Sequence, residues 1–137
     1  DSEHFSGDMV PGAPIDDAPV MLDGQPAWLI DQIGGSFCIM YFCEDPASIP
    51  PALQQQLLGL RQAAIPVETL IVSRTPGAFL LKLVVDSEGL VFQRYDAQPD
   101  TLYLVRPDQH VVARWRTMDV SCILAALSRA TANPLQE

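Results

Sequence analysis

The stretch Thr101–Trp115, which reads TLYLVRPDQHVVARW, decides the fold. Its two apolar runs, Leu102–Val105 and Val111–Trp115, are rich in the β-branched and aromatic residues that favour strands, and polar residues separate them. Pro107 presets φ for a turn, and the Asp108 side chain can accept hydrogen bonds from its own backbone. The stretch therefore predicts a β-hairpin.

The segments around this hairpin predict a sheet with helices. Upstream, the nearly continuous apolar run Ser36–Cys43 is typical of a strand buried on both faces. Leucines at helical spacing predict a helix from Pro51, and Val67–Val72 predicts the next strand. After the hairpin, Asp119 is expected to cap a helix over Val120–Ala130. Strand, helix, strand, hairpin and terminal helix form the second half of a thioredoxin-like fold, an α/β fold whose central mixed β-sheet is flanked by helices.

The remaining segments are read from weaker patterns. Pro26–Ile33 predicts a short helix with a proline near its first turn. The apolar run Phe79–Val85 does not separate strand from helix, and the residues after it predict a helix over Glu88–Tyr95. Scattered prolines and glycines make residues 1–25 an extended arm. We therefore expect an arm over 1–25 and one thioredoxin-like domain over 26–137.

Composition narrows the possible partners. The chain has 137 residues, of which 48% are hydrophobic, so one domain can bury its own core. Its net charge of −9, with only 8 lysines and arginines, argues against binding nucleic acid or an anionic membrane surface. No apolar run reaches the ~20 residues of a membrane-spanning helix. An odd number of cysteines in apolar runs suits reduced thiols, and hence a cytoplasmic location.

The cysteines do not have the spacing of a thioredoxin-type redox site. Such a site needs two thiols two residues apart at a helix N-terminus, where the helix dipole lowers the pKa of the first. Cys38 and Cys43 lie five steps apart on one strand, which places them on opposite faces. The loop Glu44–Ser48 contains no thiol, and its two carboxylates disfavour a thiolate. We therefore expect no catalytic residue, with Cys43 as the remaining candidate.

Proline, histidine and glycine patterns bear on other kinds of site. Thioredoxin-like folds have a cis-proline just before the strand that opens the hairpin, and this makes Pro99 the candidate. The histidines and cysteines show no zinc spacing, so no metal ligand is expected. No glycine-rich phosphate turn follows a strand, so no residue of the chain is expected to bind a cofactor.

Three stretches resemble a known family, the C-terminal thioredoxin-like domain of FAD-dependent aromatic-ring hydroxylases (class A flavoprotein monooxygenases of the phenol, hydroxyphenylpropionate and polyketide hydroxylase type). They are PGAPIDDAPV (Pro11–Val20), AWLIDQIGGSFCIMYF (Ala27–Phe42) and RYDAQPDTLYLVRPDQHVVARW (Arg94–Trp115). The resemblance implies a non-catalytic module of a larger oxidoreductase. FAD and NAD(P)H would then belong to the parent enzyme, and the module's partners would be that polypeptide's flavin and substrate domains.

The arm is a candidate interface. Prolines keep it extended, so its apolar side chains need a groove either on their own domain or on another chain, which would allow a homodimer. These side chains are Phe5, Met9, Val10, Ile15 and Val20.

Two alternatives remain open. One is a stand-alone thioredoxin-like or peroxiredoxin-like thiol protein that uses Cys43. The other is a binding module for small hydrophobic ligands or proteins.

Overall fold

A computed structural model describes residues 5–136 of the chain. It contains one seven-stranded mixed sheet in the order β2-β1-β5-β4-β3-β6-β7. The strands are β1 (Pro19–Leu22), β2 (Gln25–Trp28), β3 (Phe37–Cys43), β4 (Val67–Ser73), β5 (Lys82–Val85), β6 (Leu102–Val105) and β7 (Val111–Trp115). The α-helices are α1 (Pro51–Gly59), α2 (Leu90–Arg94) and α3 (Val120–Gln136), with short 3₁₀ helices at Leu29–Gln32, Pro46–Ser48 and Leu60–Gln62.

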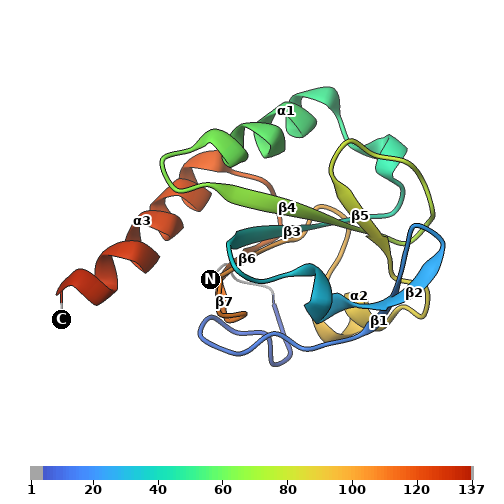
Figure 1. Ribbon diagram of the computed structural model, residues 1–137, viewed down its shortest axis with the longest axis horizontal. Helices are drawn as coiled ribbons and strands as arrows, with labels where there is room; N and C mark the ends of the chain where they lie inside the picture. The colour runs from blue at the N-terminus through green and yellow to red at the C-terminus, as the bar shows by residue number, and fades with distance from the viewer. Residues whose placement is uncertain (1–4, 137) are drawn as a thin grey trace.

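Helices cover both faces of the sheet. Helices α1 and α3 lie over one face, whereas α2 and the N-terminal arm lie on the other (Figure 1). Each face has its own hydrophobic core. Leu57 of α1 and Ile123 of α3 are buried in one core, and Phe92 of α2 and Met9 of the arm are buried in the other.

Strand β3 separates the two cores. It pairs in parallel with β4 along its whole length and antiparallel with β6. Six of its seven residues are buried, as the continuous apolar run predicted. Ile39, Tyr41 and Cys43 face the core under α1 and α3. Cys38 and Met40 face the other core, so the two cysteines lie on opposite faces as expected.

The predicted hairpin is confirmed. Strands β6 and β7 pair antiparallel, with Leu104 opposite Ala113. All four residues of β6 are buried. The side chains alternate as a period of two requires, since Leu102 and Leu104 lie in one core and Tyr103 and Val105 in the other.

Leu104→Ala should destabilise the domain by about 2–5 kcal/mol, because the truncation leaves a cavity in a dense core. Denaturant unfolding of the variant measures this loss. Leu80 is 55% exposed, and Leu80→Ala should change stability by less than about 0.5 kcal/mol. A loss below about 1 kcal/mol for Leu104→Ala would contradict the central place of β6.

The predicted helix over Pro26–Ile33 is wrong. The segment instead forms strand β2 followed by a 3₁₀ helix over Leu29–Gln32. A two-residue turn explains the difference: Asp23 and Gly24 both have positive φ, at 51° and 78°, and Leu22 pairs with Gln25. This is the geometry of a tight β-hairpin. Pro26 is tolerated because β2 is an edge strand.

The other weak patterns are resolved. Lys82–Val85 is strand β5, parallel to β4, so the ambiguous run ends as a strand. Helix α2 begins at Leu90, later than the expected Glu88, because Gly89 has a positive φ of 74°. Gly89 is the N-cap of α2, and the Asp86 carboxylate accepts hydrogen bonds from the backbone N–H groups of Val91 and Phe92 in the first turn.

The N-terminal arm packs on its own domain, and residues 1–4 of the expected arm lie outside the described residues. Gly12 N–H donates to the Val111 carbonyl at 2.7 Å, and Val111 N–H donates to the Ala13 carbonyl at 2.8 Å. The ring of Phe5 lies under the Arg116 guanidinium at 3.8 Å. Because β1 and β2 belong to the sheet, the expected boundary between residues 25 and 26 falls inside β2.

Met9→Ala should cost about 2–5 kcal/mol of stability, because Met9 is 3% exposed in the core beneath the arm. The adjacent Val10 is 43% exposed and provides a matched control, since Val10→Ala should change stability by less than about 0.5 kcal/mol. Equal unfolding midpoints for the two variants would show that the arm does not pack as described.

Candidate functional site

The carboxyl ends of β3 and β4 bring Cys43 beside Ser73. The two residues are partners in the parallel register, so their side chains share one face. Cys43 is 2% exposed and Ser73 is fully buried. The Ser73 hydroxyl is close enough to lower the pKa of Cys43, but it donates to the Thr75 carbonyl at 2.7 Å. Because a hydroxyl has one proton, its support for a Cys43 thiolate competes with the bond to Thr75.

The surroundings of Cys43 favour the neutral thiol. Burial raises the pKa of Cys43 to about 11. The Ser73 hydroxyl opposes this shift, and the negative charges of Asp45, Asp100 and Glu44 add to it. The expectation that the loop carboxylates oppose a thiolate agrees with this direction. We therefore expect Cys43 to react slowly at neutral pH, since the thiolate is the reacting form.

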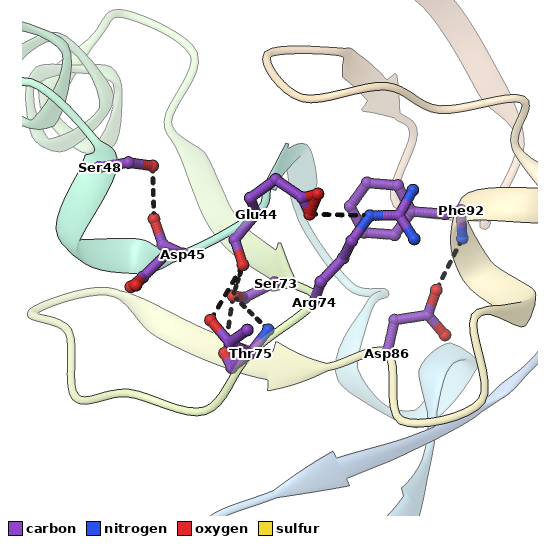
Figure 2. A network of polar contacts seen from close by, with 8 residues as sticks. All are labelled: Glu44, Asp45, Ser48, Ser73, Arg74, Thr75, Asp86 and Phe92. Atoms are coloured by element: carbon purple, nitrogen blue, oxygen red, sulfur yellow. Dashed lines mark hydrogen bonds and ion pairs between the residues drawn. The ribbon is translucent and has the colours of Figure 1, made fainter.

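Hydrogen bonds fix the loop that follows Cys43. Asp45 caps the 3₁₀ helix Pro46–Ser48, with its carboxylate accepting from Ala47 N–H at 2.9 Å. The Ser48 hydroxyl donates to the Asp45 carbonyl at 2.6 Å, and the Thr75 hydroxyl donates to the Glu44 carbonyl at 2.9 Å (Figure 2). The loop is thus tied both to itself and to the end of β4.

Arg74 holds the start of this loop through an ion pair with Glu44 and stacks on the ring of Phe92. Arg74 Nε lies 3.0 Å from the Glu44 carboxylate, and the guanidinium lies over the Phe92 ring at 3.9 Å (Figure 2). Arg74 N–H also donates to the Cys43 carbonyl at 3.1 Å. The Arg74 guanidinium is thus held by Glu44 on one side and Phe92 on the other.

Tyr41 and Asp100 meet next to Cys43. The Tyr41 hydroxyl donates to the Asp100 carboxylate. Burial, and then the hydrogen bond and charge of Asp100, raise the pKa of Tyr41. Asp100 has a positive φ of 77°, a conformation that non-glycine residues adopt rarely and that often marks functional sites.

The candidate cis-proline is wrong. The Gln98–Pro99 peptide is trans, like the other peptide bonds of residues 5–136. Asp100 makes the chain reversal here instead: its N–H donates to the Phe42 carbonyl at 2.8 Å, and Phe42 N–H donates to the Thr101 carbonyl at 3.0 Å. The two residues between Pro99 and Leu102 supply this turn, so no cis bond is needed.

A hollow of about 360 Å³ opens beside the Tyr41–Asp100 pair. It lies between the start of α1 and the connection from β7 to α3, and no cationic side chain lines it. Its lining residues are Tyr41, Pro50, Ala52, Leu53, Gln56, Asp100, Thr117 and Met118.

The other candidate residues do not join this site. Cys38 lies in the opposite core, where burial raises its pKa to about 12. Cys122 is exposed on α3, and the three cysteines are unpaired. Among the described residues, no three histidines, cysteines or carboxylates are placed to hold a metal ion. No helix in the same part of the chain is long and apolar enough to cross a membrane.

The proposed interface side chains of the arm lie mostly against this chain. Met9 and Val20 are buried, and Phe5 and Ile15 are partly buried against the same core, whereas Val10 is exposed. The groove that receives the arm is therefore on its own domain.

The chain is similar to solved structures with the thioredoxin-like fold of peroxiredoxins. No protein-family model and no curated protein matches it. A mutant of PrxQ from Xylella fastidiosa aligns with a TM-score of 0.67 at 20% identity, covering 92% of this chain and 99% of that one. Thiol peroxidase from Chromobacterium violaceum aligns with a TM-score of 0.72 at 12% identity, covering 91% and 90%. These likenesses establish the fold, and the expected α/β thioredoxin-like class is confirmed.

The expected hydroxylase module is corrected by the same comparison. The flavin-dependent monooxygenase PieE aligns with a TM-score of 0.62 at 20% identity over 83% of this chain, but over only 18% of its own. By contrast, PrxQ and the thiol peroxidase, which are peroxiredoxins, are matched along nearly their whole length. The predictions of an FAD-dependent monooxygenase and of flavin and substrate domains as partners are therefore wrong. The thioredoxin-like fold that the resemblance implied is correct.

Sequence reasoning found Cys43 but missed the groups around it. Ser73 could have been found, because two parallel strands of equal length end together and place their last residues side by side. Tyr41 and Asp100 are 59 residues apart, and no local pattern connects them. The stacking of Arg74 on Phe92 also depends on tertiary structure alone.

In the folded chain, only Cys122 should react quickly with Ellman's reagent. Cys38 and Cys43 are 4% and 2% exposed and have raised pKa values, so both should react only slowly. Absorbance at neutral pH should show one fast thiol, and denaturant should release the other two. Three fast thiols in the native protein would contradict the burial of both strand cysteines.

Proposed function

We propose that this chain is a peroxiredoxin-like thiol protein in which Cys43 reacts slowly with peroxides. The observation that carries the proposal is the position of Cys43 at the carboxyl end of β3, where it pairs with the buried Ser73 in the parallel register. The likeness to chains described as PrxQ and thiol peroxidase along nearly their full length supports it.

The reaction needs only the thiolate and the peroxide. The Cys43 thiolate attacks one peroxide oxygen, and the O–O bond breaks as the S–O bond forms. The second oxygen of hydrogen peroxide leaves as hydroxide, which takes up a proton, and sulfur is oxidised to sulfenic acid. Two equivalents of an external thiol return the cysteine to its reduced form, releasing water and a disulfide.

The site limits both the rate and the route of reduction. With a pKa of about 11, roughly one Cys43 in ten thousand is ionised at pH 7. Cys38 lies on the opposite face, and Cys122 is exposed on α3 whereas Cys43 is buried, so we expect neither to resolve the sulfenic acid within the domain. Reduction of the Cys43 sulfenic acid therefore requires a thiol from another molecule.

Peroxide consumption should rise about tenfold per pH unit from pH 7 towards the pKa of about 11, because the thiolate fraction rises by that factor. Stopped assays with hydrogen peroxide and dithiothreitol, corrected for the uncatalysed reaction, measure the rate. Dimedone labelling followed by mass spectrometry locates the sulfenic acid.

Cys43→Ser should abolish both the excess rate and the label at this position. Cys122→Ser is the matched control, because it removes an exposed thiol and leaves the strand end unchanged. If dimedone labels Cys122 alone, or if the rate survives in Cys43→Ser, the proposal fails.

A further inference from the structure

The hollow beside Tyr41 and Asp100 has the character of a small ligand site. Its volume of about 360 Å³ lies within the ~300–1,000 Å³ typical of small-molecule pockets. Leu53 of α1 and Met118 before α3 supply apolar walls, and the polar groups include a carboxylate and a phenol. This combination of apolar walls and few polar groups binds small organic molecules in a fixed orientation.

The polar groups of the hollow determine the charge of its ligand. Tyr41 is 1% exposed and its hydroxyl donates its proton to Asp100, so the hydroxyl has none for a ligand acceptor. Asp100 is exposed and carries the only full charge on the wall. Gln56 and Thr117 add neutral polar groups to the lining, so Asp100 alone selects a ligand by its charge. A cationic donor binds a carboxylate most strongly.

The charge of the rest of the chain also favours a cationic ligand. Net charge −9 attracts cations to the surface and repels organic anions. Asp45 lies near enough to act on the same Cys43 sulfur as Asp100, so the negative potential extends along this end of the sheet, whereas Glu44 is paired with Arg74. Because no lysine, arginine or histidine lines the hollow, nothing within it neutralises Asp100.

We propose that this hollow binds a small organic cation, with a protonated amine on Asp100 and a flat apolar group between Leu53 and Met118. The Tyr41 hydroxyl positions the Asp100 carboxylate for this role. The site does not use the Cys43 sulfur, so it stands independently of the peroxide chemistry proposed above.

A charge series of matched aromatic probes tests the proposal on the unmodified protein. Benzylamine, benzyl alcohol and benzoate have similar size and differ in charge. Titration followed by NMR should show benzylamine shifting the Met118 methyl and Leu53 signals, with benzyl alcohol at least about fivefold weaker and benzoate without effect. Raising the salt concentration should weaken benzylamine and leave benzyl alcohol unchanged. Equal binding of all three probes would overturn the proposal.

Substitution of the carboxylate locates the site. Asp100→Asn should weaken benzylamine binding about five- to tenfold and leave benzyl alcohol unchanged. Asparagine tolerates positive φ and retains an oxygen for the Tyr41 hydroxyl, so the fold should be kept. Glu68→Gln is the matched control, because it removes the same charge from a β4 side chain that pairs with Arg61 and does not line the hollow.

The same loss of affinity in Glu68→Gln and Asp100→Asn would mean that net charge alone attracts the cation, and the proposal would then be wrong. Cys43→Ser should bind benzylamine as tightly as the unmodified chain. This result separates the cation site from the thiol function, because either property can persist when the other is absent.

Discussion

The burial of β3 on both faces is the constraint on which the rest of the structure depends. A strand enclosed on both sides needs two covered cores, and the chain provides them with α1 and α3 on one face and α2 with the arm on the other. It also needs partners on both edges, which β4 and β6 supply. The end of this strand carries Cys43, so the same burial that organises the fold also removes water from the thiol.

Desolvation is the main reason why the pKa of the Cys43 thiol is raised in this thioredoxin-like fold. A thiolate loses its hydration at the end of β3, and the nearby carboxylates add repulsion rather than compensation. Arg74, a cation at the same end of the sheet, is paired with Glu44 and stacked on Phe92 instead. The cation at this edge therefore does not offset the negative charges around Cys43.

Patterns of short period made much of this fold predictable. Leu102 and Leu104 alternate with Tyr103 and Val105, and that alternation is enough to assign each to its core. The hairpin β1–β2 could also have been found, since Asp23-Gly24 is a strong two-residue turn signal. A helical pattern over the following residues obscured it. The Tyr41–Asp100 hydrogen bond could not be predicted from the sequence, because it depends on how the turn before β6 packs against β3.

The path of the arm across the end of β7 has a consequence for association between chains. A sheet has two edges, and each exposes unpaired N–H and C=O groups that can recruit a foreign strand. In this domain one edge is the short β2 with Pro26, which lacks a donor. At the other, Gly12 and Ala13 occupy both backbone groups of Val111, while Ile15 N–H bonds the Gln109 carbonyl. The arm thus protects the start of β7 against edge-to-edge polymerisation, a role separate from its burial of apolar side chains.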